Sequence, residues 1–197
     1  MDPNRFPGIL DLPFSPAGLQ DNMRLRSVDH LLDRQIVMTE KVEGVSIRFS
    51  RDGSHVRASK DFGDVAYIEY IGSIQKSICD TLVPGVSLFC QLPINIIDID
   101  HPDPAYLFCF AAFDERNSIW WSWDAVVSTA KILGIRPAPI LFIGTIKTGI
   151  EMLQVVENFA YQVSSGSYVG KRDGIIVRIT DPFTDFHSSV AKWQRRS

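Results

Sequence analysis

A polar, charged hexamer at residues 39–44 (Thr-Glu-Lys-Val-Glu-Gly) stands between two runs of mostly apolar residues, 35–38 and 45–49. Both runs are typical of strands, so we expect Lys41 at the end of a strand. The glycine three residues later permits a tight turn and a close approach to a ligand. A lysine that is buried or near other cations can lose its proton near neutral pH and become a nucleophile. Taken alone, the hexamer is more typical of a surface hairpin with a solvated lysine.

Length and composition favour one globular unit. The chain has 197 residues, of which 45% are hydrophobic, and this suffices for one substantial core. We expect a single domain over residues 1–197, with the proline-rich residues 1–25 as an irregular lead-in. No apolar run has the roughly 18 residues of a membrane span, and the N-terminus lacks a signal-peptide core, so we expect no membrane association. Three cysteines without metal-ligand spacing predict buried free thiols and a cytoplasmic location.

The charge of the chain argues against a strongly basic nucleic-acid binder. The net charge is −3, which disfavours tight non-specific binding to nucleic acid. Basic residues do gather near the C-terminus, at 171–172 and 192–196, where either a local anion site or a solvated tail would explain them. An acidic loop at residues 95–104 has enough carboxylates for a metal site, but a surface loop is the simpler interpretation.

Hydrophobic periodicity predicts a mixed fold. Three helices are expected over residues 65–82, 122–133 and 150–161, with Ser122 as an N-cap and a shorter helix at 27–32. The runs typical of strands are residues 36–38, 45–49, 55–59, 86–90, 106–113, 139–143, 174–179 and 189–193. Because helices and strands do not alternate strictly, the pattern predicts an α+β domain with a largely antiparallel sheet.

Four stretches in chain order resemble the motifs of covalent nucleotidyltransferases. Residues 39–44 look like the Lys-x-Asp/Glu-Gly nucleophile motif, and residues 106–110 look like the aromatic strand of an adenine pocket. Residues 173–178 (Asp-Gly-Ile-Ile-Val-Arg) are similar to Glu-Gly-x-Val-x-Arg, and residues 190–193 are similar to the closing lysine motif. The lead-in and residues 121–141 also match. The chain most resembles the phage-type and bacterial ATP-dependent RNA ligases, of one superfamily with DNA ligases and mRNA capping enzymes.

The resemblance implies a fold and a chemistry. The fold would be an ATP-grasp-like nucleotidyltransferase domain of the ligase type, with helices flanking the sheets and no OB-fold, since five residues follow Lys192. Lys41 would attack the α-phosphate of ATP and expel pyrophosphate, leaving a lysyl-AMP. Lys192 and Mg²⁺ or Mn²⁺ would supply positive charge near that phosphate, and Asp173 would be the metal ligand.

The resemblance also implies an adenosine pocket. Phe110 would stack on the adenine, with Phe113 as the alternative, and backbone groups around Glu40 would contact its edge. Lys60 would contact ribose or phosphate, with Arg57 as the alternative.

Three positions depart from the family pattern. Gln91 stands where the family has a glutamate that binds ribose, so an amide replaces a charge. Asp173 replaces a glutamate and is one methylene shorter. Ser46 stands where these ligases often have asparagine. Glu43 and Gly44 match the nucleophile motif and are assigned to the nucleotide site with it.

The acceptor stays open at this stage. The favoured partner is a nucleic acid, most naturally RNA, with a 5′-phosphate end that takes the AMP before a 3′-hydroxyl displaces it. Two alternatives are an adenylyltransferase that acts on a protein or small molecule, and a degenerate ATP-binding module that serves another ligase. The sequence leaves the oligomeric state open.

Overall fold

The protein consists of two compact units, each with its own β-sheet. The computed structural model describes residues 6–16, 24–57, 65–93, 106–162 and 174–195, with the backbone alone for 56–57 and 65–68. The first unit comprises Met1–Phe6 and Val42–Pro137, and the second comprises Pro7–Lys41 and Ala138–Ser197. The single domain expected over residues 1–197 stays a prediction.

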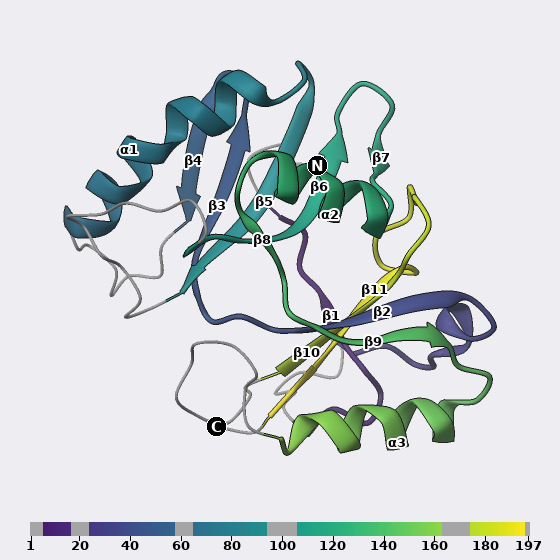
Figure 1. Ribbon diagram of the computed structural model, residues 1–197. Helices are drawn as coiled ribbons and strands as arrows, with labels where there is room; N and C mark the ends of the chain where they lie inside the picture. Colours follow the sequence, from purple (N-terminus) through teal and green to yellow (C-terminus); the bar gives the residue numbers. More distant parts are fainter. Residues whose placement is uncertain (1–5, 17–23, 58–64, 94–105, 163–173, 196–197) are drawn as a thin grey trace. The chain divides into compact units, whose positions relative to one another are not determined.

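The first unit is built on a six-stranded sheet in the order β4-β3-β5-β6-β7, with β8 paired to β6 (Figure 1). Only the β6–β8 pair is parallel among the described pairs of this sheet. The strands are β3 (Gly44–Ser50), β4 (Gly53–Arg57), β5 (Val86–Pro93), β6 (Phe108–Asp114), β7 (Ile119–Trp120) and β8 (Arg136–Pro137).

Two helices pack against this sheet. Helix α1 (Val65–Thr81) contacts β3 and β4, and its buried side chains recur three or four residues apart at Ile71, Ile74 and Ile78. Helix α2 (Trp123–Ile132) contacts β6 and β8. It begins where predicted, because the Ser122 hydroxyl accepts a hydrogen bond of 3.3 Å from the Ala125 N–H.

The second unit has a five-stranded sheet in the order β1-β11-β10-β2-β9. Its strands are β1 (Leu10–Asp11), β2 (Gln35–Glu40), β9 (Ile140–Thr145), β10 (Gly174–Ile179) and β11 (Val190–Gln194). Strand β2 lies inside the sheet, and Ile36, Val37 and Met38 are fully buried, as expected for a strand covered on both faces. Helix α3 (Gly149–Ala160) contacts β10, and a single 3₁₀ turn (Asp29–Leu31) precedes β2.

The predicted fold class is confirmed. The described residues form an α+β fold, with largely antiparallel sheets flanked by three α-helices. Three two-residue strands, β1, β7 and β8, were not predicted, because two residues are too few to show a period. The acidic loop at 95–104 lies outside the described residues. No described helix is long and apolar enough to cross a membrane.

Candidate active site

The segment that carries Lys41 connects two different sheets. Strand β2 pairs with β10 and β9, whereas β3 pairs with β4 and β5. The interpretation of residues 39–44 as a surface hairpin is therefore wrong, since the strands on either side of the hexamer do not pair. Lys41 instead follows a buried interior strand, as the nucleophile interpretation expects.

The backbone and side chain of Lys41 both pack against Gly174, at the start of β10. The Lys41 N–H donates a hydrogen bond of 3.0 Å to the Gly174 carbonyl. A Cβ on Gly174 would lie 2.9 Å from Cδ of Lys41 and 2.7 Å from the Trp193 carbonyl oxygen. Only glycine leaves this space open, so the absence of a side chain at residue 174 lets the half-buried lysine lie across the strand.

The sheet register places Lys192 on the same face as Lys41. Thr39 pairs with Ile176, and Ile176 pairs with Lys192. Directly paired residues share a face, and so do residues two apart along a strand. Lys41 follows Thr39 by two residues, so the two lysines predicted to be catalytic project from one face of the second unit's sheet. Both are half-buried.

Glu40, the residue before the nucleophile candidate, is buried at 6% exposure. Its N–H donates a hydrogen bond of 2.8 Å to the Pro139 carbonyl. The N–H groups of Glu40 and Lys41 therefore both donate within the protein, and this holds the end of β2 in place on either side.

In the first unit, Gly44 is required by strand packing. Its φ is +154°, and a Cβ there would collide with the Leu92 carbonyl of β5. The approach of Gly44 to a ligand stays a prediction, because the approach that the structure shows is to a neighbouring strand. Glu43, just before it, is exposed.

Two of the departures from the family pattern contact each other. Ser46 on β3 pairs directly with Gln91 on β5, and the Ser46 hydroxyl donates a hydrogen bond of 2.8 Å to Oε1 of Gln91. This bond fixes the amide orientation, so that the NH₂ group of Gln91 is the donor available to a ligand. The two departures from the family pattern are therefore linked, because Ser46 and Gln91 are hydrogen-bonding partners.

Phe110 lies at an irregularity of β6. Cys90 pairs with Cys109 and Phe89 pairs with Ala111, so the register passes over Phe110. Such bulges re-aim a side chain and are frequent beside functional sites. The half-buried Phe110 ring meets the Phe6 ring edge-on, with the centroids 4.9 Å apart. The alternative, Phe113, packs on Trp120 with a centroid separation of 4.8 Å.

A comparison with known protein families shows to which family the chain belongs. The family model described as RNA ligase matches residues 34–194. The chain belongs to the RNA ligase family. The match includes β2, the lysine segment and the strands β10 and β11. No curated protein matches this RNA ligase-family chain.

Solved RNA ligase structures share the fold. A Naegleria gruberi RNA ligase with PPi has a TM-score of 0.58 and 15% identity, over 85% of this chain and 51% of its own. A variant of that ligase with ATP and Mn has a TM-score of 0.55 and 13% identity, over 85% and 52%. A variant with AMP and Mn has a TM-score of 0.55 and 14% identity, over the same shares. At this identity the likeness establishes the fold alone, and the chain spans about half the length of these proteins.

Some predicted site residues lie outside the described part of this RNA ligase-family chain. Lys60 and Asp173 are among them, and the Arg57 side chain is not described. Within the described residues, no group of three His, Cys, Asp or Glu side chains could hold a metal ion. The expected roles of Lys60 and Asp173 stay predictions.

One polar residue of this face was not predicted. Asp11 on β1 pairs with Lys192 on β11 and is only 6% exposed. Burial raises the pKa of its carboxyl, which the positive charges of Lys192, Arg24 and Lys41 and a hydrogen bond from Ser15 partly oppose. The only signal in the sequence is a lone aspartate between apolar neighbours at residues 9–13.

Proposed function

We propose that the chain is an ATP-dependent RNA ligase that forms a covalent lysyl-AMP on Lys41. The observation that carries the proposal is the pair of lysines, Lys41 and Lys192, on one face of the sheet beside a glycine that leaves room for the Lys41 side chain. A binding module has no need of a nucleophile in this setting. The structural relatives described above with ATP and Mn or AMP and Mn support the same choice of nucleotide and metal.

The first step is nucleophilic substitution at phosphorus. The neutral Nζ of Lys41 forms a bond to the α-phosphorus, and the bond from that phosphorus to the oxygen bridging to the β-phosphate breaks. Pyrophosphate leaves with the electron pair, and the nitrogen of the new P–N bond gives up one proton to solvent or a base. Lys192 offsets the negative charge that develops on the α-phosphate oxygens.

One protein carboxylate together with the phosphates of the nucleotide would suffice to bind a divalent ion. Mg²⁺ is commonly held by one or two carboxylates plus substrate phosphates, so three clustered protein ligands are not needed. Asp173 directly precedes Gly174 in the sequence, and it is the residue that we propose as the carboxylate ligand. When bound, Mg²⁺ or Mn²⁺ would add positive charge at the phosphates.

The first unit supplies groups suited to adenosine. We expect Phe110 to stack on the base and the Gln91 NH₂ group to donate to a ribose oxygen, where the family's glutamate would accept. In the second unit, the Glu40 and Lys41 N–H groups are already donors to protein carbonyls. Carbonyl oxygens of this segment are therefore the groups that would accept from the adenine amine.

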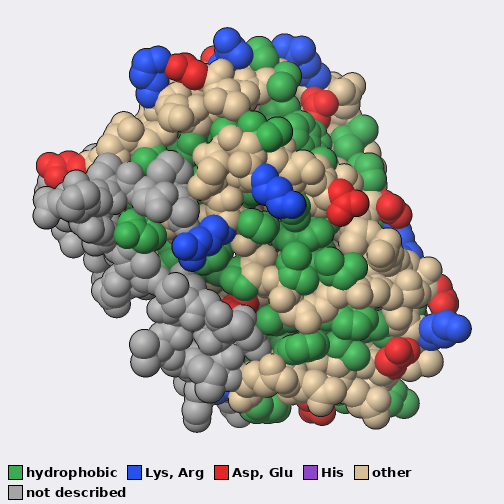
Figure 2. Space-filling view, viewed as in Figure 1, with side chains coloured by type: hydrophobic (Ala, Val, Ile, Leu, Met, Phe, Trp, Pro, Cys, Tyr) green, Lys and Arg blue, Asp and Glu red, His purple; other side chains and the backbone are tan. Residues whose placement is uncertain are grey.

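The acceptor that we propose is an RNA end with a 5′-phosphate. On the described part of the face in Figure 2, Lys and Arg side chains are scattered rather than gathered into one patch. Because the net charge of the chain is −3, we expect recognition to depend on the phosphate end more than on a long basic surface. The three cysteines are buried free thiols, which supports a reducing, cytoplasmic setting.

The test is covalent labelling with ATP that carries a radioactive α-phosphate, in Mg²⁺ or Mn²⁺, followed by denaturing electrophoresis. Wild-type protein and Lys131→Ala should be labelled equally, because Lys131 is an exposed lysine of α2. Lys41→Ala should carry no label. Label that persists in Lys41→Ala, or no label on wild type that still binds ATP, would reject the proposal.

A second assay addresses the acceptor. Labelled protein, freed of ATP, is mixed with RNA that bears either a 5′-phosphate or a 5′-hydroxyl. Transfer of AMP to the 5′-phosphate RNA alone is the expected result. Transfer to a protein or small molecule in place of RNA would support the alternative adenylyltransferase.

A further inference from the structure

Asp11 is a buried carboxylate in an element that contributes only two residues to the sheet. It is 6% exposed, and its neighbour Leu12 is fully buried. Ser15 hydrogen-bonds to the carboxylate, but the buried Oδ1 accepts no hydrogen bond from any described residue. A buried charged group with an unsatisfied oxygen is costly, so its presence needs an explanation.

The backbone holds Asp11 beside Lys192. The two residues are direct partners in the parallel pair of β1 and β11, so their side chains share a face. The Leu12 N–H donates to the Lys192 carbonyl at 2.7 Å, and the Leu25 N–H donates to the Asp11 carbonyl at 2.8 Å. The aspartate is thus fixed on both sides before any ligand arrives.

Two of the positive charges around Asp11, those of Lys192 and Lys41, belong to the proposed catalytic face. Lys192 is the strongest of the cations that act on the carboxylate, followed by Arg24, and Lys41 acts more weakly. Two lysines on one face repel each other, and a carboxylate near both offsets that repulsion. A long lysine side chain is also flexible, and a fixed opposite charge restricts where its ammonium group lies.

We propose that Asp11 is a positioning residue that orients the Lys192 ammonium group for adenylation of Lys41. The inference rests on the proposed function, since it names the group that prepares one of its two lysines. Asp11 acts through Lys192 and needs no contact with the nucleotide.

The first test is a double-mutant cycle on single-turnover formation of lysyl-AMP at saturating ATP. Asp11→Asn should slow the step by roughly 10-fold to 100-fold, as displaced catalytic groups do. In a Lys192→Ala background, the same change should slow it by less than about 3-fold, because its target is gone. Equal losses in both backgrounds would overturn the proposal.

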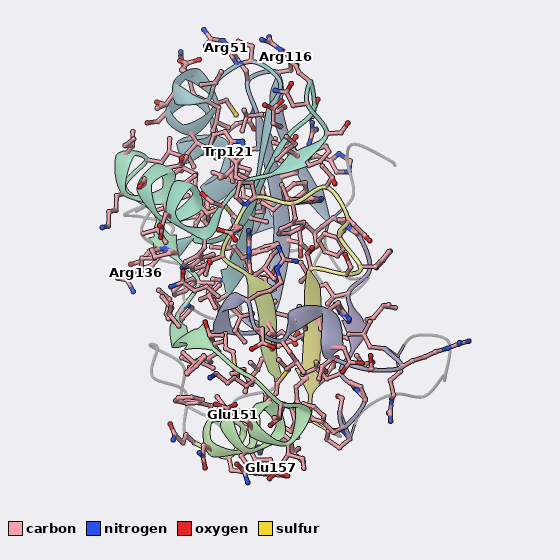
Figure 3. The ribbon with its side chains drawn as sticks, turned by 90° about the vertical axis from the view of Figure 1, so that its right-hand side faces the viewer. Arg51, Arg116, Trp121, Arg136, Glu151 and Glu157 are labelled. Carbon is pink, nitrogen blue, oxygen red and sulfur yellow. The ribbon has the colours of Figure 1, made fainter. Side chains whose placement is uncertain are left out.

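Two variants control for general damage. Glu157→Gln removes one carboxylate from the exposed face of α3 in the same unit and should leave the rate unchanged (Figure 3). Asp11→Glu keeps the charge and should recover part of the rate that Asp11→Asn loses. No recovery with a folded Asp11→Glu would favour a role in packing alone.

A readout without ATP separates this proposal from the proposed function. Acetic anhydride acylates the lysine amines that it can reach, and mass spectrometry gives the extent of acylation at each lysine. Loss of the Asp11 charge should raise acylation of Lys192 several-fold and leave acylation of the exposed Lys131 unchanged, because the flexible Lys192 side chain is then no longer held beside the buried carboxylate. Unchanged acylation of Lys192 would overturn the role of Asp11 even if lysyl-AMP forms. Conversely, absent lysyl-AMP with raised acylation would reject only the ligase activity.

Discussion

At the scale of single residues, Gly174 is the position where an added side chain would displace Lys41. Gly174→Ala would set a methyl group 2.7 Å from the Trp193 carbonyl oxygen and 2.9 Å from Cδ of Lys41, so either the strand or the lysine must move. We expect a loss of about 1–3 kcal/mol in the free energy of unfolding. We also expect lysyl-AMP formation to fall by roughly 100-fold, because small displacements of a reacting group are costly.

The matched control is Gly72→Ala in α1, where a Cβ meets no described atom within 4 Å. Replacing an open helical glycine should stabilise the protein by about 0.5–1 kcal/mol and leave lysyl-AMP formation unchanged. If Gly174→Ala behaves like this control, the packing of Lys41 on Gly174 is unimportant.

A pH titration of stability tests the buried charge of Asp11. Because burial raises the pKa of this carboxyl, the folded state binds its proton more tightly than the unfolded state, whose pKa is near 3.8. The contribution of Asp11 to the free energy of unfolding is therefore fully present below the unfolded-state pKa. It is lost as the pH rises through the raised pKa of the folded state. Asp11→Asn should be at least as stable as wild type near pH 7, with the advantage narrowing toward pH 4. Chemical denaturation across this pH range measures the difference in the free energy of unfolding between Asp11→Asn and wild type. If the variant is less stable than wild type by the same amount at every pH, the raised pKa of Asp11 is contradicted.

At the scale of secondary structure, the start of α3 depends on a reciprocal cap. The Glu151 N–H donates a hydrogen bond of 3.1 Å to the Thr148 hydroxyl, and Oε2 of Glu151 accepts one of 2.9 Å from the Lys147 N–H. Figure 3 shows Glu151 on the helix drawn at the bottom of the view. Thr148→Ala should lower the free energy of unfolding by about 1 kcal/mol, measured in urea. Thr148→Ser keeps the hydroxyl and should retain most of the wild-type stability. Equal losses for the two variants would mean that the cap contributes little.

The elements show what the sequence could and could not supply. The interior strands β2, β3 and β10 and all three helices were predicted to within a few residues, because long apolar patterns and the Ser122 cap are local signals. Pairing is not local. Taken alone, the hexamer was more typical of a hairpin, but β2 pairs with β10, which lies far along the chain. The registers of β10 with β2 and with β11 bring Lys41 and Lys192 to one face.

At the scale of the whole molecule, the two units carry different predicted site residues. The sheet of the second unit carries the lysines and Asp11, whereas the sheet of the first unit carries the Ser46–Gln91 pair and Phe110. The resemblance to RNA ligases predicted site roles for the lysines and for Phe110 through motifs. It could not identify Asp11, because a two-residue strand has no motif and its significance appears only through its partner Lys192.

The central claim is that AMP becomes attached to Lys41, and peptide mapping by mass spectrometry tests this most directly. Wild-type protein is incubated with ATP and Mg²⁺, digested without acid treatment, and every lysine peptide is examined for the added mass of AMP. The account predicts AMP on Lys41 and on no other lysine. AMP on Lys192 or another lysine, or none on protein that binds ATP, would contradict it.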